Sequence, residues 1–227
     1  MISFILAESE LELVPKELLS HKVIVSSVEK RGKKPGEILL DSNFHHNALT
    51  KVEDGERRGR PDITHIFLLI TLESVANKRG LIKNLVIHTR NNDVIYVDPK
   101  TRIMRSYNRF VGLIEQLFTK PEVADDKNQL LKLKRNFSLK KLIKKQYADK
   151  VIACTSTGEK VDLYKYLSEI EKVCEKKILF IIGGFPKGDF KTDVKKLADD
   201  VISIYHEPLT AWSVASEITT IYNLLCK

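Results

Sequence analysis

The sequence predicts an α/β fold built around a buried parallel sheet. Three short apolar runs, at 151–154, 178–182 and 201–205, show no alternation of polar and apolar residues and end at turn-forming residues. Such runs are typical of strands that are buried on both faces. Apolar residues recur at helical spacing in 161–173 and 210–225. This alternation of strand and helix favours a parallel sheet covered by helices.

Length and composition limit the class of protein. The chain has 227 residues, of which 43% are hydrophobic and 30% charged, and we expect one globular domain over 1–227. No apolar stretch approaches the roughly 18–20 residues that span a bilayer, so we expect no membrane partner. The first apolar run, 1–7, follows no basic region and therefore predicts a strand rather than a signal peptide.

The excess of basic residues favours a polyanionic partner. The net charge is +8, and lysine and arginine that neutralise phosphates release counterions. The alternative is that the charge serves only solubility. Both interpretations stay open for the lysine-rich segment 130–145, which includes a predicted amphipathic helix with a basic outer side.

The cysteines and histidines predict neither a disulfide framework nor a metal site. Cys154, Cys174 and Cys226 form no CxxC pair, which fits a reducing cytoplasm, and we expect small core residues at all three positions. His45 and His46 are adjacent and would point about 100° apart on a helix, so they cannot both face one metal ion.

The N-terminal half shows shorter patterns, from which we expect the following elements. Predicted strands lie at 2–7, 37–41, 81–88 and 94–98, the last two joined as a hairpin, and predicted helices lie at 8–19, from Ser42 or Asn43 to about Val52, and at 66–76, with a basic loop at 30–35.

A polar, arginine-dense loop at 54–62 precedes the predicted helix at 66–76. Within it, Arg60 lies between Gly59 and Pro61, where the backbone is tightly specified and the side chain must project outward. A solvated loop with a helix cap at Asp62 or Thr64 would not need three arginines. The loop is therefore a candidate functional segment.

Three further arginines, Arg102, Arg105 and Arg109, are spaced by three and four residues and would share one face of a helix over 102–110. Guanidinium groups on one stripe repel each other unless an anion lies between them, and their geometry matches phosphate. The spacing predicts contact with phosphate groups, and a solvated basic face is the alternative.

The loops after the three C-terminal strands are the candidate ligand site. Ligands of open α/β sheets bind at the carboxyl ends of the strands. The loops at 154–156, 183–190 and 203–209 are expected to meet at that edge, where main-chain donors can bind an adenosyl group. The Gly183–Gly184 pair belongs to neither a GxGxxG nor a Walker motif, which disfavours a nucleotide-dependent oxidoreductase.

Three motifs resemble a known family. Ile-Gly-Gly-Phe-Pro-Lys-Gly-Asp-Phe at 182–190, Pro-Leu-Thr-Ala-Trp-Ser-Val-Ala-Ser at 208–216 and Gly-Arg-Pro-Asp at 59–62 are similar to motifs of a SPOUT-class RNA methyltransferase family. This family N1-methylates a pseudouridine in small-subunit ribosomal RNA and assists assembly of that subunit in archaea and eukaryotes. The resemblance implies a parallel-sheet core with a C-terminal trefoil knot, family-specific insertions in the N-terminal half, and a homodimer.

The resemblance also implies that S-adenosyl-L-methionine is the cofactor. His206-Glu207 replaces the family's more usual residues before Pro-Leu, which matters little if backbone atoms make the contacts. The expected cofactor contacts are Cys154, Gly183, Gly188, Asp189, Phe190, Ser203, Ile204, Tyr205, His206, Glu207, Pro208 and Leu209.

The Gly-Arg-Pro-Asp motif implies the catalytic residues. In the family its arginine contacts the RNA beside the target base, and its aspartate steadies that arginine, so we expect Arg60 and Asp62 in these roles. Arg60 would stabilise the uracil anion that forms as N1 loses its proton. Asp62 is disfavoured as a general base, because a carboxylate paired with arginine is a poor base.

Arg60, Arg102, Arg105 and Arg109 match the family's RNA contacts. The expected partners are small-subunit ribosomal RNA, a second copy of the chain and ribosomal assembly proteins. The alternative function is that of a ribosome-assembly factor that binds ribosomal RNA and has no essential methyltransferase activity.

Overall fold

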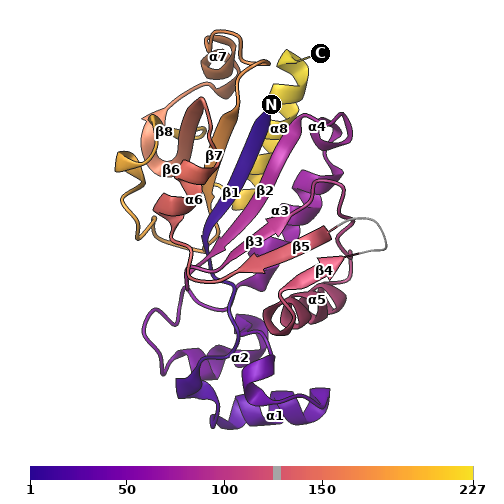
Figure 1. Ribbon diagram of the computed structural model, residues 1–227. Helices are drawn as coiled ribbons and strands as arrows, with labels where there is room; N and C mark the ends of the chain where they lie inside the picture. The colour runs from indigo at the N-terminus through magenta and orange to yellow at the C-terminus, as the bar shows by residue number, and fades with distance from the viewer. Residues whose placement is uncertain (125–128, 227) are drawn as a thin grey trace.

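A mixed sheet forms the centre of the molecule, in a computed structural model that describes residues 1–124 and 129–226 (Figure 1). Its strand order is β4-β5-β3-β2-β1-β7-β6-β8. The five neighbouring strands β2, β1, β7, β6 and β8 pair in parallel. Strands β3, β5 and β4 extend the sheet at the β2 edge with antiparallel pairing. The strands are β1 (Ile2–Ser9), β2 (Ile82–Thr89), β3 (Val94–Val97), β4 (Glu122–Ala124), β5 (Gln129–Lys134), β6 (Lys150–Lys160), β7 (Ile178–Gly183) and β8 (Asp200–Ser203).

Helices cover the sheet unequally. The larger apolar cluster joins one face of the sheet to α3, α5, α7 and α8, and a smaller cluster joins the other face to α6. The helices are α1 (Lys22–Arg31), α2 (Ser42–Leu49), α3 (Pro61–Glu73), α4 (Val75–Lys78), α5 (Tyr107–Thr119), α6 (Leu139–Lys145), α7 (Leu163–Ser168) and α8 (Ala211–Leu225), with single 3-10 turns at Lys16–Leu18, Pro35–Glu37 and Val194–Lys196.

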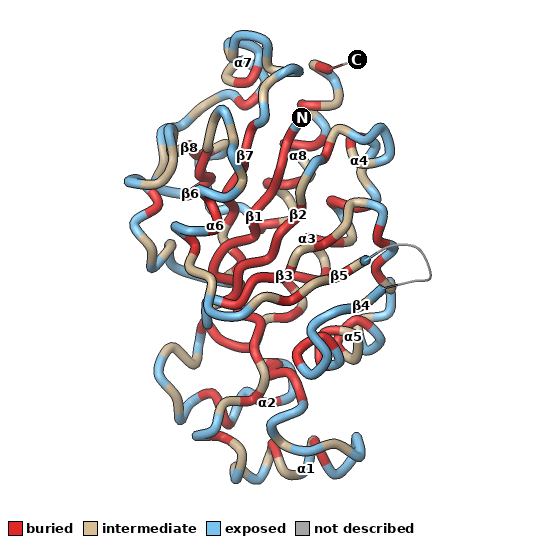
Figure 2. Tube along the Cα trace, in the orientation of Figure 1, coloured by how far each residue is buried: buried red, intermediate tan, exposed pale blue. Residues whose placement is uncertain are grey.

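The central strands are buried on both faces, as their unalternated sequences predict. In β1, Phe4 and Leu6 belong to the larger cluster, while Ile5 and Ala7 belong to the smaller one. Because both sets of side chains are shielded, the strand needs no polar alternation. Figure 2 shows this as a continuous buried centre crossed by β1, β2 and β7. The predicted parallel core and the hairpin of β2 and β3 are confirmed.

The expected helix at 8–19 and the expected strand at 37–41 are wrong. Residues 10–15 are extended because their backbone pairs with 38–40: the Val14 amide donates to the Ile38 carbonyl, and the Leu40 amide donates to the Glu12 carbonyl, both at 2.9 Å. A single bridge, Leu13 to Leu39, is all that forms between them, and only the 3-10 turn Lys16–Leu18 is helical.

The N-terminal helices α1 and α2 lie beyond one end of the sheet, where they form a third apolar cluster with the segments around Val14 and Ile38 (Figure 1). Helix α1 was not predicted. The helix α2 was, but Asp41 caps it instead of Ser42 or Asn43, and it ends at Leu49 rather than near Val52.

The expected helix over 102–110 is wrong in its first part, since α5 begins only at Tyr107. Contacts with other elements hold the preceding segment out of the helix. The Thr101 hydroxyl donates to the Leu130 carbonyl (3.1 Å), and His65 Nε2 donates to the Met104 carbonyl (2.7 Å).

The expectation of no disulfide is also wrong. Cys174 and Cys226 form a disulfide, with Cα atoms 5.5 Å apart and a sequence separation of 52. The C-terminal end of α8 returns to the turn that follows α7, a proximity that spacing alone does not reveal. Cys154 is a free, buried cysteine, as predicted. Within the described ranges, none of the helices combines the length and apolarity required to cross a bilayer.

Candidate functional site

A cavity of about 710 Å³ opens at the ends of β7 and β8 and beside residues 154–157 of β6. The predicted loops at 183–190 and 203–209 form much of its wall together with residues 154–157, and the first turns of α3 and α8 complete it through Arg60, Ile63 and Trp212. The expected end of a strand at 154 is wrong, since 155–160 still belong to β6, whose pairing with β8 shifts register between Cys154 and Glu159. The parallel strands run in the same direction, so their carboxyl ends meet at this edge. With the exception of His206, every predicted cofactor residue lines the cavity: Cys154, Gly183, Gly188, Asp189, Phe190, Ser203, Ile204, Tyr205, Glu207, Pro208 and Leu209.

The loop after β7 has a conformation that only glycine permits at two places. A Cβ atom on Gly184 would lie 2.7 Å from the Cα atom of Ser9, so the close approach of this loop to the end of β1 requires its absence. Gly188 has a φ of +79°, in the left-handed region that favours glycine. The glycines therefore set the path of the backbone around the cavity.

The loop after β8 is shaped by its own polar groups. The Ser203 hydroxyl donates to the Tyr205 carbonyl at 2.8 Å and turns the chain away from the strand. The rings of Tyr205 and His206 lie 4.0 Å apart between centroids, and both side chains are exposed. Thr210 then caps α8 through its hydroxyl, which accepts from the Ser213 amide.

Cys154 lies in β6 and is not a reactive thiol. Burial raises the pKa of Cys154 to about 12, so the thiol stays protonated near neutral pH and acts as wall rather than nucleophile. Three residues on, the Thr157 hydroxyl donates to Asp189 Oδ2 at 2.9 Å. This bond joins the irregular segment of β6, where its pairing with β8 shifts register, to the loop after β7.

Arg60 and Asp62 form a bidentate pair at the rim of the cavity. Arg60 Nε and Nη2 donate to the two Asp62 oxygens at 2.8 and 2.7 Å, and about three tenths of the Arg60 side chain is exposed (29%). These hydrogen bonds raise the pKa of Arg60 above its ordinary value. Pro61 at the first position of α3 and a bond from the Arg60 amide to the Glu10 carbonyl (2.9 Å) fix the backbone. The pair presents a permanent, partly accessible cation beside the cavity.

The other predicted RNA-binding arginines lie elsewhere. Arg102 and Arg105 are exposed in the segment before α5, and Arg109 is exposed on the first turns of α5. They do not line the cavity, and Arg105 instead borders a shallow hollow between α3, α4 and α8. The structure therefore does not place these side chains on one helical stripe. Their role in RNA binding stays a prediction.

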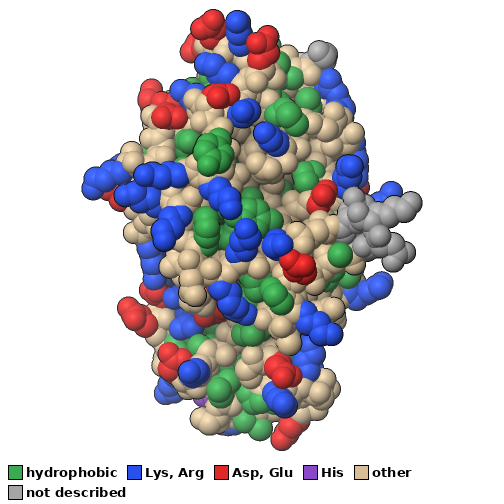
Figure 3. Space-filling model, in the orientation of Figure 1, with side chains coloured by type: hydrophobic (Ala, Val, Ile, Leu, Met, Phe, Trp, Pro, Cys, Tyr) green, Lys and Arg blue, Asp and Glu red, His purple; other side chains and the backbone are tan. Residues whose placement is uncertain are grey.

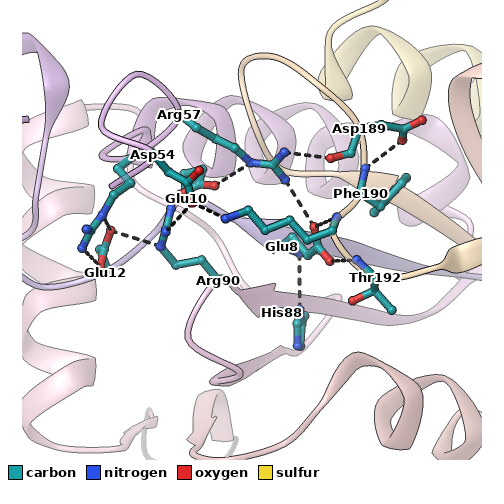
Figure 4. Close-up of polar contacts among 12 residues, drawn as sticks. Glu8, Glu10, Glu12, Asp54, Arg57, His88, Arg90, Asp189, Phe190 and Thr192 are labelled. Atoms are coloured by element: carbon teal, nitrogen blue, oxygen red, sulfur yellow. Dashed lines mark hydrogen bonds and ion pairs between the residues drawn. The ribbon is translucent and has the colours of Figure 1, made fainter. Parts of the chain in front are cut away.

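A buried ionic network that the sequence patterns did not predict lies around the end of β1 (Figure 4). Its carboxylates come from Glu8, Glu10 and Glu12, and its guanidinium groups come mainly from Arg57, Arg58 and Arg90. The missed signal is the alternation of glutamates at 8, 10 and 12, which places their side chains on one side of an extended segment. The expected helix over this segment hid that pattern.

No group of histidine, cysteine and acidic side chains in the described residues has the arrangement of a metal site. The cavity is lined by backbone groups, by apolar side chains and by the charged side chains of Arg60, Lys187, Asp189 and Glu207. Such a site suits an organic ligand with both polar and apolar parts.

Comparisons with known proteins agree with this geometry. Residues 4–223 match the family model described as EMG1/NEP1 methyltransferase. The chain is 46% identical to the ribosomal RNA small subunit methyltransferase Nep1 of Methanothrix thermoacetophila, over 98% of this chain and 95% of that protein. It is 45% identical to the Pyrococcus furiosus protein of the same name, over 97% of this chain and 96% of the other.

A solved structure supports the same assignment. The crystal structure of Archaeoglobus fulgidus Nep1 bound to S-adenosylhomocysteine superposes with a TM-score of 0.84 and 30% identity, covering 98% of this chain and 97% of that one. The matched region includes the sheet, the cavity and the arginine-dense loop. The chain therefore belongs to the EMG1/NEP1 methyltransferase family.

Proposed function

We propose that this chain transfers a methyl group from S-adenosylmethionine to N1 of a pseudouridine in small-subunit ribosomal RNA. As a member of this family, the chain is an S-adenosylmethionine-dependent methyltransferase of ribosomal RNA. The observation that carries the finer proposal is the position of Arg60. The Arg60 guanidinium lies on the wall of the cavity, next to the position where we expect the acceptor base to acquire negative charge.

The cavity fits the cofactor in size and chemistry. Its walls combine backbone groups of three loops with apolar side chains such as Ile182, Ile202 and Trp212. We propose that the predicted cofactor residues that line the cavity hold the ligand there. When bound, S-adenosylmethionine supplies an electrophilic methyl carbon on a sulfonium.

The chain's own residues prepare the acceptor. Pseudouridine N1 carries a proton that must leave before or during attack, so negative charge develops on the uracil ring. Arg60 stabilises that charge electrostatically, and Asp62 fixes the direction of the guanidinium through two hydrogen bonds. The loops position the reacting atoms, which must approach to about 3–3.5 Å.

The proposal extends to the fold and the assembly. We propose a single domain with α1 and α2 as an insertion. We also propose the C-terminal trefoil knot that the family resemblance implies, in the region where β6 lies between β7 and β8 in the sheet. We also propose a homodimer, supported by exposed apolar residues around α4 and α8, among them Val75 (62% exposed) and Leu224 (49%). A ribosomal RNA substrate fits the cytoplasmic location and the assembly partners predicted from the sequence.

The test combines binding with turnover. Calorimetry should show S-adenosylhomocysteine binding to the purified chain, and labelled methyl groups should enter a pseudouridine-containing stem-loop RNA. The matched control is the same stem-loop with uridine, which has a carbon-linked hydrogen rather than N1–H at that edge and should stay unlabelled. RNA binding without methyl transfer would instead support the assembly factor, and equal labelling of both RNAs would refute pseudouridine as the acceptor.

A further inference from the structure

Arg57 links two loops that are distant in sequence. It lies in the arginine-dense loop before α3, and only 8% of the residue is exposed. Its Nη1 donates to the Asp189 carbonyl at 2.7 Å, and its guanidinium lies 3.8 Å above the ring centroid of Phe185. Asp189 and Phe185 both belong to the loop after β7 that lines the cavity. One buried side chain thus contacts this loop at two points.

Two carboxylates hold that guanidinium in place. Arg57 Nε donates to Glu10 at 2.8 Å and Nη2 donates to Glu8 at 3.2 Å, and both glutamates are buried at the end of β1 (Figure 4). With its charge compensated, the guanidinium is fixed in one plane, which suits a planar fork that donates in several directions. Its position is therefore set by the sheet and not by the loop.

Glu8 contacts the far end of the same loop. Its two oxygens accept hydrogen bonds from the backbone amides of Lys191 (2.7 Å) and Thr192 (2.8 Å). Glu8 has a φ of +51°, a left-handed conformation that a non-glycine residue rarely adopts, and the pairing of β1 with β2 shifts register at this point. Such strained residues persist where the surrounding contacts require them. Here the turn directs the carboxylate to the loop.

We propose that Arg57 is a positioning residue, which together with Glu8 sets the shape of the loop 185–192 around the methyl donor and couples it to the loop that carries Arg60. The proposal rests on the function proposed above. Exposed ion pairs from Lys187 to Glu56 and from Lys191 to Asp54 join the same two loops. The loop after β7 is therefore connected to the arginine-dense loop near both of its ends. Because contacts with the end of β1 already order this loop, less conformational entropy is lost when the ligand binds.

Arg58 provides a matched control. It is adjacent in sequence, equally buried (9% exposed), and paired with a buried glutamate, Glu12, at 2.8 and 2.9 Å. Within the described residues, the hydrogen bonds of its side chain go to Glu12 and none reaches the loop after β7. Loss of Arg58 therefore reproduces the loss of a buried ion pair without touching the cavity.

The experiment compares Arg57→Gln with Arg58→Gln in the full chain. We expect Arg57→Gln to weaken S-adenosylhomocysteine binding about tenfold, a loss typical of one charge-assisted hydrogen bond, while Arg58→Gln retains the wild-type Kd. Arg57→Lys keeps the charge beside Glu8 and Glu10 but lacks the planar fork, so it should fold with a near-wild-type Tm and still bind more weakly. Wild-type affinity in both folded Arg57 variants, or equal losses in Arg57→Gln and Arg58→Gln, would overturn the proposal.

A measurement without ligand separates this inference from the proposed function. Hydrogen exchange at the Lys191 and Thr192 amides should be faster in Arg57→Lys than in the wild type and unchanged in Arg58→Gln. Failure of the wild type to bind S-adenosylhomocysteine would count against the proposed function alone. Unchanged exchange in Arg57→Lys would count against the positioning role alone.

Discussion

At the scale of single residues, Arg60 and Asp62 show how a local motif produces a functional cation. Pro61 starts α3, and Asp62 follows within its first turn, so both oxygens of the carboxylate reach the guanidinium without any long-range contact. The motif alone does not determine which part of the fold lies next to this pair. The Arg60 amide bonds to the Glu10 carbonyl, which fixes the motif beside the end of β1 and hence beside the cavity.

The first prediction concerns Arg60→Ala. The side chain is partly exposed and contributes to no apolar cluster, so the variant should retain the wild-type Tm and its Kd for S-adenosylhomocysteine. Methyl transfer should fall about 10²–10³-fold in kcat, the usual loss when one stabilising group is removed from a developing anion. Single-turnover labelling of the pseudouridine stem-loop measures this, and unchanged turnover would remove Arg60 from the mechanism.

The second prediction concerns the pH dependence of stability at His88. Its Nδ1 accepts from the Glu8 amide (3.3 Å) and its Nε2 donates to the Asn92 side chain (3.1 Å), so the folded chain holds the neutral ring. Burial lowers the pKa of His88 below its ordinary value, despite the nearby Glu8 carboxylate. The unfolded chain therefore binds the proton more tightly, and stability falls as pH drops below about 6.5.

Urea unfolding at several pH values between 5.5 and 7.5 tests this. The free energy of unfolding should rise with pH in the wild type, and the rise should be smaller in His88→Gln, which cannot titrate. Parallel curves for the two proteins would show that another group, such as the buried His45, accounts for the slope.

At the scale of elements, α8 connects the cavity to the far end of the molecule. Its first turn lines the cavity through Ala211, Trp212 and Val214, and its last residues meet the turn after α7 through the Cys174–Cys226 disulfide. Between these ends, Ile218 and Tyr222 are fully buried. The helix is thus capped by Thr210 at one end and crosslinked by the disulfide at the other.

The third prediction is that Cys226→Ser lowers the free energy of unfolding by about 2–4 kcal/mol, because the crosslink restricts the unfolded chain over a long loop. Activity at 25 °C should be unaffected, since the disulfide lies at the opposite end of α8 from the cavity. Equilibrium unfolding in guanidinium chloride, with and without a reductant, measures this loss of stability. Reductant should bring the wild type to the level of the variant, and a wild type insensitive to reductant would contradict the prediction.

At the scale of the whole molecule, basic side chains are widely distributed. Figure 3 shows Lys and Arg side chains spread over the viewed face, in keeping with the net charge of +8. The lysines of α6 project from the opposite side of the sheet to α3 and α8, because Leu139, Leu142 and Ile143 pack into the smaller apolar cluster. The predicted RNA-binding arginines instead precede or belong to α5, on the side of the larger cluster.

The fourth prediction uses this difference. Replacing Arg102, Arg105 and Arg109 by alanine should weaken RNA binding and lower the slope of log affinity against log salt by about 2, since each phosphate contact on a single strand contributes about 0.7. The charge-matched control replaces Lys140, Lys141 and Lys144 on α6. Equal changes in both triple variants would show that the arginines add only general charge.

The sequence by itself determined the parallel core, because apolar runs such as 178–182 leave no alternative to burial on both faces. The resemblance of the Gly-Arg-Pro-Asp motif predicted the local pair of Arg60 and Asp62, and the strand pattern placed the loops after β7 and β8 at one edge. The strand end expected at 154 was wrong. The sequence patterns also failed at 8–19 and 102–106, where partners from distant segments satisfy the backbone and override the helical spacing. Helix propensity is weak enough for such contacts to prevail.

Only the tertiary structure decided which distant groups meet. The Cys174–Cys226 disulfide, the network of Glu8 with Arg57, and the contact of Arg57 with Asp189 each join segments separated by dozens of residues or more. Neither periodicity nor spacing encodes these pairs, since each depends on where the sheet brings its strand ends together. A strand pattern depends on residues that are close together in the sequence. A buried ion pair forms only when the folded core brings its two partners together, and the low dielectric of that core makes an unpaired charge unfavourable.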